Sequence, residues 1–166
     1  QRVRLFLAEL DLAEGAFDDA ARRLESVDTA PFGDEHRHAW MVLQAELCQR
    51  QGRRDEAVAQ YEVVLAESGG PEALLRARVG LAHLQLLAGD FQAVLAALDG
   101  VTAEGAKAET AGALHNLRGG ALVRLGRRDE ALAEFECALS FGRSSEDRGL
   151  TARALLNRAL VQRSTG

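Results

Sequence analysis

Apolar and polar positions along the chain repeat with a period of 37 residues. The period is marked by four glycines, at positions 15, 52, 89 and 126, and each separates two segments with the apolar spacing of an amphipathic helix. Because glycine suits the left-handed residue that ends a helix, we predict a long helix before each glycine and a second helix after it. We call these helix A and helix B. A fixed period of this length indicates one helical hairpin stacked on copies of itself.

Small residues paired with large ones are expected to hold each hairpin together. Seven residues before the glycines, helix A carries the small residues Ala8, Ala45, Ala82 and Gly119. Five residues after the glycines, helix B carries Ala20, Ala57, Val94 and Ala131, and four positions later it carries Leu24, Tyr61, Leu98 and Phe135. Residues at i and i+4 share one face of a helix, and small residues let two helices approach closely. We therefore predict that these positions form the packing face of every hairpin.

The joints between hairpins divide the chain into units of about 1–33, 34–70, 71–106 and 107–143, with a partial unit over 144–166. Pro71 is expected at the first position of a helix. At the last joint, Gly142 is expected to end a helix, and Ser144 or Ser145 to begin the next one with an acidic first turn. Residues 146–163 then form a further helix A, with Ala159 as its small residue and no helix B.

This last helix contains more leucines than one buried stripe needs. Its arginines, at positions 148, 153, 158 and 163, could supply the polar outer face of a capping helix. We favour the other interpretation, in which the array continues and the chain is a fragment of a longer polypeptide.

The composition favours an all-α domain and excludes some functions. Hydrophobic residues make up 47% of the 166 residues, aromatic residues only 5%, and there are two prolines. The net charge of −5 argues against binding to nucleic-acid backbones, which requires a concentrated basic face. There is no apolar run of the roughly 18 residues that a membrane span needs, and Glu9 and Asp11 come too early for a signal peptide. We expect a soluble, cytoplasmic protein.

Candidate chemistry is sparse. Cys48 and Cys137 lie far apart without metal-binding spacing, so we expect buried or half-buried thiols. His36 and His38 would point roughly 200° apart on a helix, which favours solvated or capping side chains over a metal site. There is no phosphate-binding glycine loop and no nucleophile motif. We predict no metal, no cofactor and no enzymatic activity.

At these positions the chain resembles the tetratricopeptide repeat family. Ala57 with Tyr61, and Ala131 with Phe135, match the Ala-x-x-x-Phe pattern of its helix B, and the four small residues of helix A fall where the family has glycine. The period of 37 exceeds the usual 34, and long repeats of this kind look like those of bacterial regulatory and signalling proteins. The resemblance implies a right-handed superhelical solenoid of four antiparallel hairpins plus one terminal helix.

The resemblance also implies a concave groove lined by the A helices, which would bind an extended peptide or a helix. By analogy with the family, the lining residues are Leu5, Glu9, Leu12, Val42, Glu46, Gln49, Arg50, Arg76, Val79, His83, Leu86, Asn116, Gly120, Val123 and Arg124. Glu9 and Glu46 would repel a carboxylate, so the C-terminal clamp of some family members is not expected. These two acids could attract a basic segment, or they could be ordinary solvated side chains.

The resulting prediction is a scaffold that binds a protein or peptide without catalysis. The alternative is a sensor or oligomerisation segment of a larger bacterial transcriptional or signalling regulator. Self-association through the terminal helix is a further possibility, and neither nucleic acid nor membrane is an expected partner of this segment.

Overall fold

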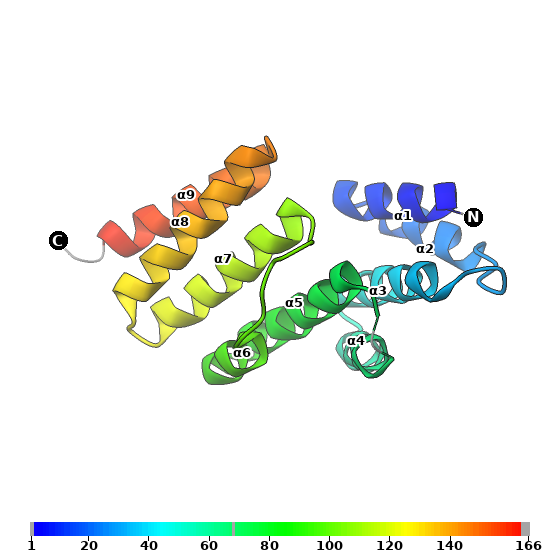
Figure 1. Cartoon of the computed structure of the whole chain (residues 1–166), viewed down its shortest axis with the longest axis horizontal. Coiled ribbons are helices and arrows are strands. Elements are labelled where there is room, and N and C mark those ends of the chain that lie inside the picture. The colour runs from blue at the N-terminus through cyan, green and yellow to red at the C-terminus, as the bar shows by residue number, and fades with distance from the viewer. Residues whose placement is uncertain (1, 68, 164–166) are drawn as a thin grey trace. The chain divides into compact units, whose positions relative to one another are not determined.

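The computed structural model describes residues 2–67 and 69–163, and all regular secondary structure within them is α-helical (Figure 1). The helices are α1 (Arg2–Glu14), α2 (Phe17–Glu25), α3 (Asp34–Arg50), α4 (Arg54–Ala66), α5 (Pro71–Ala88), α6 (Phe91–Leu98), α7 (Ala108–Arg124), α8 (Arg128–Ser144) and α9 (Arg148–Arg163). The odd-numbered helices are the predicted A helices, and α2, α4, α6 and α8 are the B helices. Over residues 2–67 and 69–163, four helical hairpins followed by one helix confirm the predicted all-α solenoid architecture.

The chain forms two compact units, residues 1–80 and 81–166, and the boundary between them falls inside α5. In the first unit, α1 packs against α2, α3 packs against α4, and α3 also contacts α1 and α2. In the second unit, α7 contacts α6 and α8, and α9 packs against both α8 and α7. Within each unit, a helix therefore contacts its hairpin partner and its neighbours along the chain, as in a helical solenoid.

The four repeat glycines end the A helices in the same conformation, as predicted. Gly15, Gly52, Gly89 and Gly126 have φ values between 77° and 81°. At each turn the glycine N–H bonds to a carbonyl three residues back, and the following N–H bonds to a carbonyl five residues back, for example Arg53 N to Cys48 O at 2.8 Å. These bonds satisfy carbonyls that the end of a helix would otherwise leave without partners. Because only one residue then precedes the next helix, the two helices must run antiparallel.

The predicted small and large residues form the interior of each hairpin. The small A-helix residues Ala8, Ala45 and Ala82 have no exposed surface, and neither do Ala20, Ala57, Val94 and Ala131 of the B helices. The large B-helix residues Leu24, Tyr61, Leu98 and Phe135 are at most 1% exposed. The packing face read from the sequence is confirmed at every hairpin.

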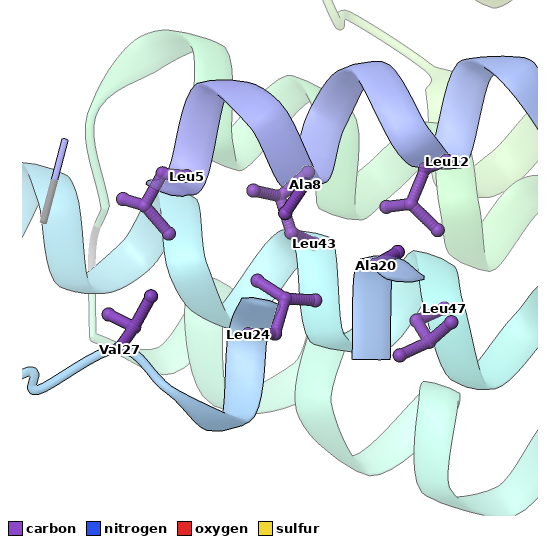
Figure 2. Packing of buried hydrophobic residues seen from close by; sticks show 8 residues of the cluster. All are labelled: Leu5, Ala8, Leu12, Ala20, Leu24, Val27, Leu43 and Leu47. Atoms are coloured by element: carbon purple, nitrogen blue, oxygen red, sulfur yellow. The ribbon is translucent and has the colours of Figure 1, made fainter. Parts of the chain in front are cut away.

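Figure 2 shows this packing in the first unit. Leu5, Ala8 and Leu12 project from α1 toward α2 and α3, where Leu24 and Leu43 meet them in one cluster. The cluster also contains Ala20, Val27 and Leu47, so three helices share one core. In the second unit, α9 is joined to this kind of core through Val161, which packs with Leu122, Ala131 and Phe135.

Several glycines inside helices mark places where helices approach too closely for a side chain. A Cβ atom on Gly119 would lie 2.5 Å from Phe135 Cε1, and one on Gly80 would collide with the ring of Tyr61. The two largest fully buried side chains of the B helices, Tyr61 and Phe135, therefore each pack against a glycine of an A helix. Close packing of this kind leaves no room for even one additional methyl group.

The joint between α8 and α9 differs from the prediction. Gly142 does not end a helix, because α8 continues to Ser144 and Gly142 is buried against Thr151 and Leu150. The left-handed residue is Glu146, with φ 58°, and Asp147 caps α9 by accepting a hydrogen bond from Leu150 N at 2.9 Å. The prediction for Gly142 is wrong because this glycine is needed for close packing between α8 and α9, whereas Glu146 adopts the left-handed turn conformation.

Two neighbouring glycines in α7 allow a matched test of this packing. We expect Gly119→Ala to lower the free energy of unfolding by about 1–3 kcal/mol, because the new methyl group meets the Phe135 ring. Gly120→Ala should be neutral or stabilising by up to about 1 kcal/mol, since its Cβ would meet only Leu86, at 3.9 Å. Urea unfolding of the two variants measures the difference, and equal destabilisation would contradict the packing role of Gly119.

The turn at Glu146 yields a second prediction. A left-handed conformation costs a residue with a side chain about 1–2 kcal/mol, so Glu146→Gly should stabilise the protein by about 1 kcal/mol. Gly126→Ala, at a repeat turn, should destabilise it by a similar amount. Thermal unfolding should show opposite shifts, and a loss of stability in the Glu146 variant would show that its side chain has another role.

Candidate binding surface on the A helices

In the first unit, the predicted lining residues are organised around Arg76. Its guanidinium group in α5 bonds to both carboxylate oxygens of Glu46 in α3, with distances of 2.9 Å from Nε and 2.6 Å from Nη2. Nη1 bonds to Glu9 Oε1 in α1 at 2.7 Å. One arginine thus links three successive A helices, and its planar fork suits bidentate binding of a carboxylate.

The electrostatics of this cluster change the predicted role of its acids. Burial lowers the pKa of the Arg76 guanidinium, but the attraction and hydrogen bonds of Glu46, together with Glu9, outweigh burial and raise it overall. Arg76 therefore remains charged. Glu9 and Glu46 are not ordinary solvated side chains, because both pair with Arg76. The cluster of three has a formal charge of −1, and its attraction for a basic segment stays a prediction.

Other predicted lining residues of this unit belong to the core. Val42 has no exposed surface, and Leu5 and Leu12 are each only 7% exposed. These three side chains therefore offer a ligand little or no contact. Gln49 is half-buried and accepts a hydrogen bond from the Tyr61 hydroxyl at 3.0 Å, and the burial of Tyr61 raises the pKa of that hydroxyl. Arg50 is exposed and Val79 is half-buried.

In the second unit, Gly120 is the most informative of the predicted residues. Gly80, Gly112, Gly119 and Gly142 all lie within helices at points where a Cβ would collide with a neighbour. The space around Gly120 is open, apart from Leu86 of α5 at 3.9 Å. Glycine in a helix costs about 1 kcal/mol of stability relative to alanine. Among the described residues, neither a close packing contact nor a turn explains why glycine occupies position 120.

Asn116 lies one turn before Gly120 on the same face of α7. Its Oδ1 accepts a hydrogen bond from Asn157 Nδ2 of α9 at 3.3 Å. Its own Nδ2 is buried and has no hydrogen-bond partner among the residues that the structure describes. Asn157 was not among the predicted residues, because the sequence carries no signal that places it beside a residue 41 positions earlier.

The remaining predicted residues of this unit lie in different surroundings. Arg124 stacks over the ring of Phe91 in α6, with its Cζ atom 5.0 Å from the ring centroid, in a cation–π contact. His83 and Leu86 are half-buried, and Val123 is exposed at the end of α7.

Two expectations about single residues are wrong. His38 is neither solvated nor capping: its ring is buried beneath Gly69, and Nε2 lies 3.1 Å from Glu67 Oε2. Cys48 is buried as expected, but Cys137 is exposed on α8. Partial burial, followed by the nearby Glu134 and Glu136, raises the pKa of the Cys137 thiol, which therefore does not have the character of an activated nucleophile.

The described part of the chain offers no metal centre or membrane span. Within residues 2–67 and 69–163, no three His, Cys, Asp or Glu side chains are grouped so that they could hold a metal ion. Over the same residues, no helix combines the length and apolar content that crossing a bilayer requires.

Stacked antiparallel hairpins, joined by one repeated left-handed turn, define a helical repeat protein. Comparison with protein families agrees: the model described as a tetratricopeptide repeat-like domain matches residues 34–158. The chain belongs to the tetratricopeptide repeat-like family. Neither the search of curated proteins nor that of solved structures returned a match.

The ion cluster provides a test of its structural role. We expect Arg76→Met to lower the free energy of unfolding by about 1–3 kcal/mol, because Glu9 and Glu46 would then face each other without their cation. Arg50→Met, at an exposed arginine, is the matched control and should change stability by less than about 0.5 kcal/mol. Chemical denaturation measures the free energy of unfolding of both variants. If Arg76→Met lost no more of it than Arg50→Met, the ion cluster would not stabilise the fold.

Proposed function

We propose that this chain is a scaffold that binds a peptide segment of another protein on the accessible lining residues of the A helices in its second unit, without catalysing a reaction. Membership of the tetratricopeptide repeat-like family supports the general role, since such domains are typically non-catalytic scaffolds that often mediate protein interactions. In the first unit, the predicted lining residues that retain accessible surface are Glu9, Glu46, Gln49, Arg50, Arg76 and Val79. In the second unit, which carries the proposed site, they are His83, Leu86, Gly120, Val123 and Arg124.

Gly120 is the observation that carries the proposal. A helical glycine that no described residue of the chain requires for packing allows the backbone of a ligand to approach the helix closely. Leu86 lies beside the open space and supplies an apolar contact. Asn116, one turn away, has a buried amide N–H₂ group without a partner among the described residues, and a peptide carbonyl that reached it would accept its hydrogen bond. An unsatisfied buried donor costs about 1–3 kcal/mol, so such a bond would favour binding.

A substitution that fills the open space at Gly120 tests the proposal. Peptides that bind the whole chain would first be selected from a random library displayed on phage, and their dissociation constants measured by fluorescence anisotropy. We expect Gly120→Leu to weaken binding by about tenfold or more, because its side chain occupies the space that the ligand needs. Val63→Ser, which removes an exposed apolar side chain on the B helix α4, is the control and should leave affinity unchanged.

Unfolding measurements on the same variants separate blocked binding from lost structure. The proposal fails if the library yields no binding peptide, or if selected peptides bind the Gly120 variant as tightly as the original protein. It also fails if Val63→Ser reduces affinity as much as Gly120→Leu, since binding would then involve the B helices.

A further inference from the structure

Arg124 is an exposed cation at one end of the surface around Gly120. Its guanidinium group stacks over the ring of Phe91 at the start of α6, with Cζ 5.0 Å from the ring centroid. Among the described residues, no carboxylate pairs with it. The acid next to Phe91 in the sequence, Asp90, instead caps α6 by accepting a hydrogen bond from Ala93 N at 3.1 Å. The charge of Arg124 is therefore available to a ligand.

Stacking on Phe91 leaves the hydrogen-bond donors of Arg124 free. A guanidinium group in a cation–π contact presents its flat face to the ring, while its N–H bonds lie in the plane of the group. A carboxylate can therefore bind at the edge of the group without displacing the ring. The contact also restricts the arginine side chain, which reduces the entropy lost when a ligand binds.

Arg124 and the open space at Gly120 lie on the same face of α7. They are four residues apart, as are Asn116 and Gly120. A rise of 1.5 Å per residue separates Gly120 and Arg124 by about 6 Å along the helix axis. An extended peptide advances by about 3.3 Å per residue, and its alternate side chains point the same way. Two residues of an extended ligand therefore cover the distance from Gly120 to Arg124.

The surroundings of Gly120 indicate which ligand residue lies above it. Leu86 of α5 lies beside the open space, and Val123, three residues further along α7, is 36% exposed. A ligand side chain above Gly120 would contact these two apolar residues. Because burial of apolar surface stabilises a complex in proportion to its area, a large apolar side chain is favoured there.

We propose that the surface around Gly120 selects peptides in which a large apolar residue and an aspartate or glutamate stand two positions apart. The apolar side chain packs on Leu86 and Val123, and the carboxylate binds the edge of the Arg124 guanidinium group. This specificity rests on the peptide-binding function proposed above and names the ligand of the same site. The net charge of −5 disfavours acidic ligands in general, so a preference for one here would come from Arg124 itself.

Peptide selection gives the first test. Peptides displayed within a phage coat protein have no free C-terminus, so any selected carboxylate belongs to an acidic side chain. The original protein should enrich peptides with an acid two positions from a large apolar residue. Selection on Arg124→Gln should retain the apolar residue and lose the acid.

Dissociation constants of synthetic peptides with amidated C-termini measure the contact directly. Arg124→Gln should weaken the binding of a selected peptide by about three- to tenfold. Replacing the acid of the peptide by its amide should weaken binding to the original protein similarly. The two changes together should have no larger effect than either alone, because they remove the same contact. Arg124→Glu should prefer a peptide with lysine in place of the acid.

Arg54→Gln is the matched control. Arg54 is an exposed arginine on the B helix α4, so this substitution changes the net charge equally without touching the A helices. It should leave the affinity unchanged, and thermal unfolding should show that both glutamine variants are folded. If Arg54→Gln weakened binding as much as Arg124→Gln, only the overall charge would matter and the proposal would be wrong.

Three further results would overturn the proposal. The first is equal binding of selected peptides to Arg124→Gln and to the original protein while Gly120→Leu still blocks them, which would leave the peptide-binding function intact. The second is binding that requires a free C-terminus on the peptide, which would assign Arg124 to a terminal carboxylate. The third is the absence of any binding peptide, in which case the peptide-binding function fails as well.

Discussion

The close approach of the two helices in each hairpin is the constraint on which the rest of this structure depends. A small residue of helix A faces a small residue of helix B and a large one four positions later, and all of them are buried. Phe135 faces Gly119 of its own hairpin, whereas Tyr61 has Ala45 in its own hairpin and packs against Gly80 of the following A helix. Each contact therefore joins one large buried side chain to small residues on the helices around it.

This packing leaves only a narrow strip of each A helix accessible. One side of the helix is covered by its own helix B, and another by the preceding hairpin, so residues such as Val42 that resemble lining positions are in fact core. In the first unit, Arg76 neutralises part of the acidic charge, and in the second unit Gly120 leaves an open space. A binding function is consequently best sought where the strip lacks a side chain, because the charged cluster of the first unit contributes mainly to holding its A helices together.

Helix α9 shows the same close packing on the side that faces α8. Ala154 packs with Ala138 and Leu139, and Val161 packs with Ala131 and Phe135. A helix of a repeat protein is thus buried by the neighbours along the chain, and α9 is buried in this way against α7 and α8.

The sequence by itself determined the hairpins, their turns and their packing residues. These features depend on short-range rules: the period of a helix, the freedom of glycine to adopt a positive φ, and the size of residues four positions apart. Only the tertiary structure decided which polar groups are paired, since Arg76 meets acids 30 and 67 positions away and Asn157 meets Asn116 across 41. It also decided that Gly142 serves packing while Glu146 forms the turn. Burial and pairing of a side chain depend on neighbours that are distant in sequence, and for these the local pattern carries no signal.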